Sequence, residues 1–400
     1  MERIPRVKKT DSQEHAVGRP ITRRRLLQSA AASLVAPTIF GCASARQVVE
    51  PVPGPALPVI PPIVPAPPPL GPLALDPLPI ATLPSPELGQ SHVVRYVAGL
   101  RPYRRGTVRI EHEPLDTKTI IHHYGHGGAG FTLSWGTAEE AADLLARHHA
   151  PPQRVAVLGG GVIGLTTAVV LQERGYRVTV YAKAVTPDTT SDLAGAQFAP
   201  SLVQCDSDAR LNRWVRAAAE RFLTLRGDDY GVYERANYTT ANAAAALRKL
   251  PTDLFPTRQF HRLPFAGPPR SGRVHQTLLI EPPIYLPRML QRLHEAGGTL
   301  LPRTFNTAQD ITDLPQAVAV NCLGLGSGEL FPDRALSPLR GQLVYMQPQA
   351  LPYLLSHAGY LFPRKDALVL GGTVERGVND ATPNDRACQN ILATHRQFFA

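Results

Sequence analysis

The residues of this 400-residue chain with the clearest chemical potential lie in two glycine-rich stretches. Residues 125–130 read Gly-His-Gly-Gly-Ala-Gly, directly after Tyr124, and residues 159–164 read Gly-Gly-Gly-Val-Ile-Gly. Glycine has no side chain to hold a ligand away from the backbone. Both stretches could therefore bring backbone N–H groups close to a phosphate or a carbonyl oxygen.

The second stretch lies inside a predicted strand–helix–strand unit. The short apolar run at residues 154–158 predicts a strand, and residues 165–174 predict a helix that stops at Gly175. Residues 177–181 predict the second strand. Glycines between a strand and a helix in such a βαβ unit indicate a dinucleotide-binding site.

Each glycine of this turn has a physical task in a dinucleotide site. Gly159 permits the tight turn, Gly161 lets the backbone approach a pyrophosphate, and Gly164 lets the helix pack close to the sheet. The helix N-terminus, with Val162 and Ile163, would offer N–H groups to the phosphates. We therefore predict all five as cofactor-binding residues.

The acid that usually follows the second strand and binds the ribose hydroxyls is missing. The position is occupied by Lys183, which cannot accept those hydrogen bonds. This lysine could meet a phosphate or simply point to solvent. The substitution weakens an NAD interpretation and lowers the expected affinity for the adenosine moiety.

Composition supports a real hydrophobic core, because 43% of the residues are hydrophobic and 18% are charged. The formal net charge is +10, but residues 1–25 contain eight Lys and Arg against three acids. We expect this segment to be removed, so the remainder is only mildly basic. The charge therefore indicates no nucleic-acid partner.

Residues 1–45 are predicted to be a twin-arginine export signal. Residues 22–28 carry consecutive arginines ahead of an apolar run at 26–40 that is too short for a membrane span. Cys42 resembles the lipid-bearing residue of a lipoprotein site, with plain cleavage near 43–45 as the alternative. The alternative to an export signal is an ordinary amphipathic helix after a basic tail. We expect a periplasmic protein, or one held at the envelope only by a lipid on Cys42.

Residues 46–90 are predicted to be a linker outside the folded domain. Residues 51–90 contain 15 of the 40 prolines, and proline neither donates to a sheet nor continues a helix. The folded part would then be residues 91–400. Of the cysteines, Cys205 and Cys388 could form a disulfide, but isolated cysteines are more often small buried hydrophobes.

Several later segments resemble the D-amino-acid oxidase family. A run of hydroxyls follows the second strand, and residues 320–324, 340–342 and 370–373 match later segments of that family in order. The most specific match, residues 99–136, resembles the family's C-terminal signature but precedes the first strand. We interpret the chain as a circular permutation, with residues 91–150 as the displaced block and 151–400 as the rest. A separate N-terminal domain that looks similar is the alternative.

The resemblance implies a fold, a cofactor and a set of site residues. The fold is α/β, with an FAD-binding Rossmann-like doubly wound parallel sheet and an antiparallel-sheet substrate domain; the cofactor is FAD. Arg101 would bind the substrate carboxylate, Gly128 would offer a carbonyl to its amine, and Tyr124 is a further catalytic candidate. The resemblance assigns these residues to the cofactor: Thr189, Thr190, Ser191, Gly195, Gln197, Gly127, Gly130 and Thr132. The glycine loop would present N–H groups to the flavin.

The activity implied is oxidation of a small amino-acid substrate. The α-hydrogen of a D-amino acid would leave as hydride to flavin N5, giving a 2-oxo acid and ammonia, with dioxygen as acceptor and hydrogen peroxide as product. The alternatives are a flavin amine oxidase or dehydrogenase for another substrate, and a catalytically silent FAD-binding envelope protein. The oligomeric state is not predicted.

Four further details of the sequence bear on this picture. No tyrosine precedes the strand at residues 276–281, so the lid tyrosine is expected to be missing, with Ser271 in its place. Arg270 and Arg273 could favour an acidic substrate, although a solvated loop is the preferred interpretation. The histidines at 122, 123 and 126 are not expected to bind a metal, because a glycine-rich loop lacks the rigidity. A capping box at Thr137 and Glu140 predicts a helix start.

Overall fold

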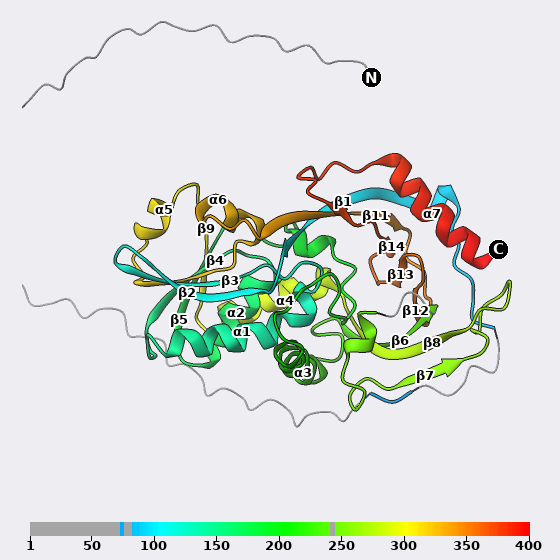
Figure 1. The fold of residues 1–400 in the computed structure, drawn as a ribbon, viewed down its shortest axis with the longest axis horizontal. Coiled ribbons are helices and arrows are strands. Elements are labelled where there is room, and N and C mark those ends of the chain that lie inside the picture. The colour runs from blue at the N-terminus through cyan, green and yellow to red at the C-terminus, as the bar shows by residue number, and fades with distance from the viewer. Residues whose placement is uncertain (1–72, 76–81, 241–244) are drawn as a thin grey trace, which may run out of the picture. The chain divides into compact units, whose positions relative to one another are not determined.

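Two β-sheets carry the fold (Figure 1), and the segment ahead of the dinucleotide motif contributes strands to both. The computed structural model describes residues 73–75, 82–240 and 245–400. All of these described residues belong to one compact unit. The export signal and the lipid site predicted within residues 1–45 lie outside the described residues.

The first sheet is mainly parallel and has six strands among the described residues, in the order β2-β3-β10-β4-β5-β9. Only β2 runs antiparallel, against β3. The strands are β2 (Arg109–Leu115), β3 (Lys118–Tyr124), β4 (Arg154–Leu158), β5 (Arg177–Ala182), β9 (Thr299–Pro302) and β10 (Val318–Asn321). Consecutive residues of β4 pack in two different hydrophobic cores, so both faces of this sheet are covered.

Helices lie on both faces of the parallel sheet. One core contains residues of α1 (Gly130–Ala146), α2 (Val162–Glu173), α3 (Asp208–Thr224) and α4 (Pro282–Glu295). The core on the other face takes residues from α5 (Ala308–Thr312) and from the end of α6 (Ser327–Leu330). The predicted βαβ unit is confirmed: β4, α2 and β5 are all present, and Gly175 follows α2 with a φ of 85°.

The second sheet has nine strands among the described residues and is mainly antiparallel. Its order is β1-β11-β14-β13-β12-β6-β8-β7, with β15 paired to β11, and only β12 and β6 pair in parallel. The strands are β1 (Val93–Arg104), β6 (Val232–Thr240), β7 (Thr257–Phe260), β8 (Gly272–Ile280), β11 (Leu336–Met346), β12 (Tyr353–Ser356), β13 (Tyr360–Pro363), β14 (Leu368–Gly371) and β15 (Glu375–Arg376). This combination of two sheets confirms the predicted fold class.

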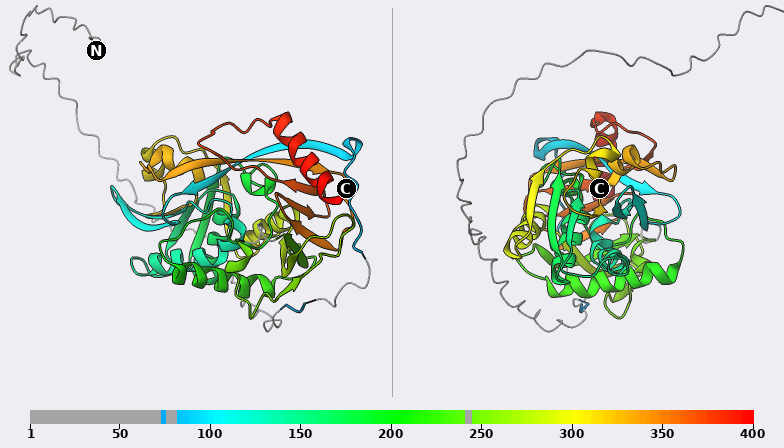
Figure 2. Two further views of the ribbon diagram at one scale, coloured as in Figure 1. Left: turned by 45° about the vertical axis from the view of Figure 1, so that its right-hand side comes forward. Right: turned by 90° about the vertical axis from the view of Figure 1, so that its left-hand side faces the viewer.

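One face of the second sheet is covered by the last helix, α7 (Asp385–Phe399), which is red in Figures 1 and 2. Its residues Ile391, Leu392 and Phe398 share a core with Val344 of β11 and Leu370 of β14. Helix α7 thus packs on the sheet through one apolar face. Short 3-10 helices complete the described structure: Gln90–His92, Thr190–Leu193, Leu247–Lys249 and Gly324–Gly326.

The block at residues 91–150 is built into both sheets. Strand β1 pairs with β11 along its length, from Val93 opposite Met346 to Arg104 opposite Leu336. Strand β3 pairs with β10, and α1 packs on α2 and α3. This segment does not fold apart from the rest. Its origin as a displaced C-terminal block stays a prediction.

The end of the predicted linker is part of the fold, contrary to our expectation. The Leu83 N–H donates to Pro264 O (2.7 Å), the Tyr353 hydroxyl donates to Pro84 O (2.6 Å), and Arg396 Nε donates to Leu88 O (2.7 Å). Proline cannot donate a hydrogen bond, but its carbonyl still accepts one. Residues 82–90 therefore lie against the antiparallel sheet and α7.

Two local expectations need correction or completion. Helix α1 begins at Gly130, and Thr137 lies inside it, donating its hydroxyl to Leu133 O (2.8 Å), so the capping box predicted with Glu140 is wrong.

Cys205, Cys322 and Cys388 are all free thiols, and Cys388 is fully buried. In the described part of the chain, no helix is both long and apolar enough to cross a membrane.

Candidate active site

A cavity of about 1820 Å³ is lined by residues of both sheets. Arg101 of β1, Gly128 before α1, Gly161 before α2, Ser191 and Tyr360 of β13 all line it. Pockets for a single small molecule usually measure about 300–1,000 Å³. The cavity is therefore large enough for a dinucleotide together with a small substrate.

The N-terminus of α2 faces this cavity, and Gly161 just ahead of it has no side chain to cap it. The N–H of Val162 donates to Ser191 Oγ (3.1 Å). The N–H groups of Ile163 and Gly164 have no acceptor within a helix that starts at Val162. Such a helix end suits a pyrophosphate, since free N–H groups and the helix dipole both favour negative charge.

Gly164 itself does not line the cavity. A Cβ atom at this position would lie 1.9 Å from the carbonyl oxygen of Gly159. The structure thus places Gly164 where helix and strand touch, which is the packing task that its spacing predicts. Gly159, Gly161, Val162 and Ile163 do line the cavity.

The predicted hydroxyl segment also lies at the cavity, and Thr189, Thr190, Ser191, Gly195 and Gln197 all line it. The Thr189 hydroxyl and N–H both donate to Asp192 Oδ2, at 2.6 and 2.9 Å. Thr189 therefore fixes the loop, and the side chain that meets the α2 N-terminus is Ser191. The side-chain nitrogen of Gln197 is buried and has no partner among the described residues.

The glycine loop before α1 lines the cavity but does not offer the N–H groups that we expected. The Gly127 N–H donates to Pro102 O (2.8 Å), and the Gly128 N–H donates to Leu202 O (3.3 Å). Both donors are already used in holding the loop against its neighbours.

The free donors come instead from the N-terminus of α1. Ala129 precedes this helix and provides no side-chain cap. The first-turn N–H groups of Gly130, Phe131 and Thr132 have no intrahelical acceptor, and all three residues line the cavity. The Thr132 hydroxyl, predicted to contact the flavin, donates to Ala199 O at 2.9 Å. A second uncapped helix end thus faces the cavity.

Arg101 is held between two strands and a tyrosine. Its Nη1 atom donates to Thr373 O (3.4 Å), and the guanidinium lies close above Gly341 of β11. Its positive charge also acts on the hydroxyl of Tyr360 and opposes the rise that burial causes in the pKa of that hydroxyl. A guanidinium and a phenol at one point of a cavity make a suitable carboxylate site, because the two N–H donors of arginine match the two carboxylate oxygens.

Tyr360 is a candidate site residue that the sequence did not reveal. The lid tyrosine was expected upstream of β8, where Ser271 stands, whereas the tyrosine that lines the cavity belongs to β13. Its ring stacks on Phe362 with centroids 4.4 Å apart, and burial raises the pKa of its hydroxyl. The phenol therefore stays protonated and can donate a hydrogen bond. No local sequence signal marks it, because β14 and β11 separate β13 from β1 in the sheet.

The two arginines considered as evidence for an acidic substrate do not line the cavity. Arg270 lies over the ring of Phe398 at 4.6 Å and donates to Pro268 O (3.3 Å). Arg273 is exposed. Their positions favour the solvated-loop interpretation.

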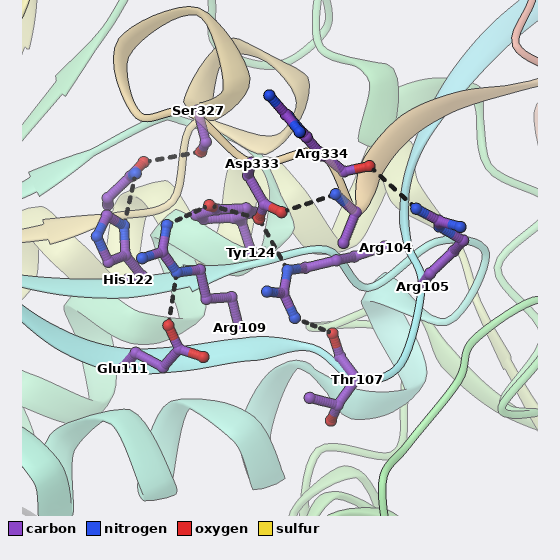
Figure 3. A network of polar contacts seen from close by, with 12 residues as sticks. Arg104, Arg105, Thr107, Arg109, Glu111, His122, Tyr124, Ser327, Asp333 and Arg334 are labelled. Carbon is purple, nitrogen blue, oxygen red and sulfur yellow. Dashed lines mark hydrogen bonds and ion pairs between the residues drawn. The ribbon is translucent and has the colours of Figure 1, made fainter.

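Tyr124, our further catalytic candidate, lies outside the cavity. Its hydroxyl donates to Asp333 Oδ2 (2.9 Å) and accepts a hydrogen bond from Arg109 Nη1 (2.9 Å), as Figure 3 shows. Asp333 also accepts from Arg104 Nε (2.8 Å). The network joins β1, β2 and β3 to the loop before β11. Burial raises the pKa of the Tyr124 hydroxyl to about 12. The contacts of Tyr124 indicate a structural role in place of the catalytic role that the resemblance implies.

The three histidines around the glycine loop are buried and bonded to protein groups. His122 Nε2 lies 3.0 Å from Glu113, His123 Nδ1 lies 2.9 Å from the Thr167 hydroxyl, and His126 Nε2 lies 3.0 Å from the Thr137 hydroxyl. Burial lowers the pKa of His123 to about 3. In the described part of the chain, no cluster of His, Cys, Asp or Glu has the makings of a metal site.

This chain is similar to a known family and to several characterised oxidases. The family model DAO, FAD dependent oxidoreductase, matches residues 80–144 and 154–400. The D-amino-acid oxidase of Streptomyces coelicolor is 35% identical over 254 residues, covering 60% of this chain and 75% of that protein. The D-aspartate oxidase of Homo sapiens is 28% identical over 263 residues, covering 60% and 74%. The solved glycine oxidase from Bacillus cereus has a TM-score of 0.45 and 17% identity, covering 60% and 77%.

The cavity fits the cofactor that this similarity implies. Two uncapped helix ends and a glycine turn match the charged and polar parts of a flavin dinucleotide. The size of the cavity leaves room for a substrate beside Arg101. The chain therefore belongs to the DAO family of FAD-dependent oxidoreductases, and its cofactor is FAD.

Proposed function

We propose that this protein catalyses the oxidative deamination of a D-amino acid. In balance, the amino acid, dioxygen and water give a 2-oxo acid, ammonia and hydrogen peroxide. The observation that carries the proposal is the pair Arg101 and Tyr360 in the same cavity as two uncapped helix N-termini. The names of the curated relatives support the choice of substrate class.

The substrate carboxylate is the group that Arg101 and Tyr360 would hold. The guanidinium provides two parallel N–H donors, and the neutral phenol adds a third donor. The carbonyl of Gly128, which lines the same cavity, would accept a hydrogen bond from the amine. Three fixed contacts orient the α-carbon and thereby convert a chance encounter into a positioned reaction.

The residues around the cavity would hold FAD, which would supply the hydride-accepting chemistry at the α-carbon. The N–H groups at the start of α1 would stabilise the negative charge that develops on the reduced ring, because they are fixed before the reaction begins. The start of α2 and Ser191 would hold the pyrophosphate. No side-chain base is needed if the amine enters in its neutral form.

The test is anaerobic bleaching of the yellow protein by a panel of D- and L-amino acids, glycine and secondary amines. We expect bleaching by D-amino acids alone and hydrogen peroxide on readmission of air. Bleaching by glycine or a secondary amine alone would assign another substrate. Absence of bleaching by every compound would leave a silent FAD-binding protein.

A matched pair of variants ties the activity to the cavity. Arg101→Lys loses the paired N–H donors and should lower kcat/KM about 100-fold. Arg105→Lys changes an exposed arginine directly after the end of β1 and should leave kcat/KM unchanged. An equal response of both variants would remove Arg101 from the carboxylate site.

We also propose that the enzyme is exported by the twin-arginine route and carries a lipid on Cys42. The support is the sequence of residues 22–42. Replacing Arg23 and Arg24 by lysine should retain the protein in the cytoplasm, and Cys42→Ser should release it from the membrane fraction. Unchanged fractionation of both variants would contradict the proposal.

A further inference from the structure

The segment at residues 371–375 contacts both side chains that are proposed to bind the substrate carboxylate. The ring of Tyr360 lies directly over Gly371, which leaves no room for a Cβ atom at position 371. Arg101 Nη1 donates to the carbonyl oxygen of Thr373 (3.4 Å). The position of this segment therefore sets the positions of both side chains.

Apolar packing contributes little to holding this segment in place. The side chain of Val374 is 48% exposed, and the strand that ends the segment, β15, has two residues. Strand β15 pairs with β11 at two positions, where Arg340 lies opposite Glu375 and Leu339 lies opposite Arg376. A segment with few buried apolar contacts opens easily unless polar contacts fix it.

A short network of polar contacts supplies that fixation. The Thr373 hydroxyl accepts a hydrogen bond from the Gln342 N–H (3.0 Å) and donates one to Glu375 Oε1 (2.6 Å). Glu375 Oε2 accepts from Arg340 Nε (3.0 Å) and Nη2 (2.6 Å). One carboxylate thus ties Thr373 to a cation of the neighbouring strand, and hydrogen bonds to charged groups are stronger than those between neutral groups.

The network lies on the far side of the backbone from the cavity. Thr373 lines the cavity, whereas Glu375 and Arg340 do not. Arg340 directly precedes Gly341 in β11, so its side chain points away from the face on which the Arg101 guanidinium lies. Thr373 therefore links the two sides, because its carbonyl meets Arg101 and its hydroxyl meets Glu375.

Glu375 is ionised at neutral pH. Burial raises the pKa of its carboxyl group, but the hydrogen bonds from Thr373 and Arg340 outweigh burial and leave that pKa below its usual value. The carboxylate can therefore accept from both partners at once, which a neutral amide with a single oxygen cannot do.

We propose that Glu375 is a positioning residue, which fixes the Thr373 carbonyl and through it the direction of the Arg101 guanidinium. This inference rests on the proposed function, since it concerns the carboxylate site of that function. A guanidinium with a fixed direction presents two parallel N–H donors to one carboxylate, and the same group loses that match when it turns.

The experiment measures the dissociation constant of propionate, a carboxylate without an amine, from its effect on the absorbance spectrum of the holoenzyme. Glu375→Gln keeps the size of the side chain but leaves one acceptor oxygen for two donors. Thr373→Val keeps the carbonyl and removes the hydroxyl. We expect the dissociation constant to rise about tenfold in each variant, with unchanged flavin content. The conservative variant Thr373→Ser keeps the hydroxyl and should retain the parent value.

Asp380→Asn is the matched control. Asp380 is the outer partner of Arg340, at 3.4 Å, and 60% of its side chain is exposed. The variant removes one carboxylate charge from the same network but leaves the contact between Glu375 and Thr373 in place. The dissociation constant of propionate should stay within about twofold of the parent value, because exposed ion pairs contribute little.

A double-mutant cycle tests whether Glu375 acts through Arg101. Steady-state rates with D-alanine are measured for Glu375→Gln, for Arg101→Lys and for the double variant. We expect Glu375→Gln to raise KM about tenfold and to lower kcat by less than about threefold when position 101 is arginine. With lysine at position 101, the same change should have almost no effect on KM. A general loss of stability would lower kcat/KM by the same factor in both backgrounds.

The outcomes separate this inference from the proposed function. Unchanged propionate binding in Glu375→Gln and Thr373→Val contradicts the role of Glu375, and so does an equal effect of Glu375→Gln with arginine and with lysine at position 101. Failure of every D-amino acid to reduce the parent protein contradicts the proposed function, while a tenfold loss of propionate affinity in Glu375→Gln would still support the role of Glu375. A parent protein that binds no propionate contradicts the carboxylate site and both proposals with it.

Discussion

The guanidinium of Arg101 lies directly against Gly341 on the neighbouring strand. A Cβ atom at position 341 would stand 2.3 Å from both terminal nitrogens of Arg101. Strand β11 thus leaves room for the arginine on the cavity side of β1 by having no side chain there. The proposed carboxylate site depends on glycine at position 341 as much as on the arginine.

Gly341→Ala should therefore impair substrate binding without unfolding the protein. The methyl group displaces the end of a flexible side chain, so the backbone can stay in place while the guanidinium moves. We expect KM for a D-amino acid to rise about tenfold with unchanged flavin content. Gly328→Ala is the control, because its Cβ would have 3.4 Å to its nearest neighbour. A KM that is equal in both variants would show that Arg101 does not need its present position.

Tyr124→Phe should affect stability and not catalysis. It removes the hydroxyl that donates to Asp333 and accepts from Arg109, leaving two part-buried partners short of a hydrogen bond. We expect the free energy of unfolding to fall by about 1–3 kcal/mol, measured by urea denaturation. The value of kcat/KM should stay within about twofold of the parent, since the tyrosine does not reach the cavity. A loss of turnover at full stability would return Tyr124 to the catalytic residues.

Lys183→Glu should strengthen FAD binding. Lys183 lines the cavity at the end of β5, where an acid would accept hydrogen bonds from the ribose hydroxyls. We expect the dissociation constant of FAD to fall about tenfold, as measured by titration of the apoprotein. The control is Lys249→Glu, the same charge reversal at an exposed residue that does not line the cavity. Weaker binding in Lys183→Glu would mean that the lysine contacts a phosphate.

Acid should destabilise the fold through its buried histidines. The pKa of His123 is about 3 in the folded protein and about 6.5 in an unfolded chain, because burial disfavours the charged ring. The unfolded state then binds more protons below pH 6.5, so this contribution is complete above pH 6.5 and is lost as the pH falls toward 3.

The measurement is urea unfolding at pH 7, 6 and 5. His123→Asn should reduce the slope of unfolding free energy against pH by about 1.4 kcal/mol per unit below pH 6. His148→Asn, at an exposed position, should keep the parent slope. A slope that does not change in His123→Asn would show that this ring is protonated in the folded state.

Local sequence patterns predicted β4, α2 and β5 because the strand, the glycine turn and the helix stop are contiguous. The start of α1 could not be predicted in the same way, since residues 125–130 are typical of a loop. Tertiary packing overrides this preference for a loop, because α1 already begins at Gly130. Tyr360 was missed because it meets Arg101 only through the pairing of strands far apart in the chain. Tyr124 was a catalytic candidate because it lies in the segment that resembles the family's C-terminal signature. Hydrogen bonds to Arg109 and Asp333 hold it outside the cavity.

The placement of β1 and β3 has a consequence for the order in which the ribosome delivers the chain. Strand β3 pairs with β2 nearby in the chain, but its other edge pairs with β10 only after Val318 has been synthesised. Strand β1 gains its partner β11 only when the chain has reached Met346. Such distant pairing makes folding slow, since long loops must close before contacts form. The first strands to be synthesised are among the last to be completed, so neither sheet can close until most of the polypeptide has emerged.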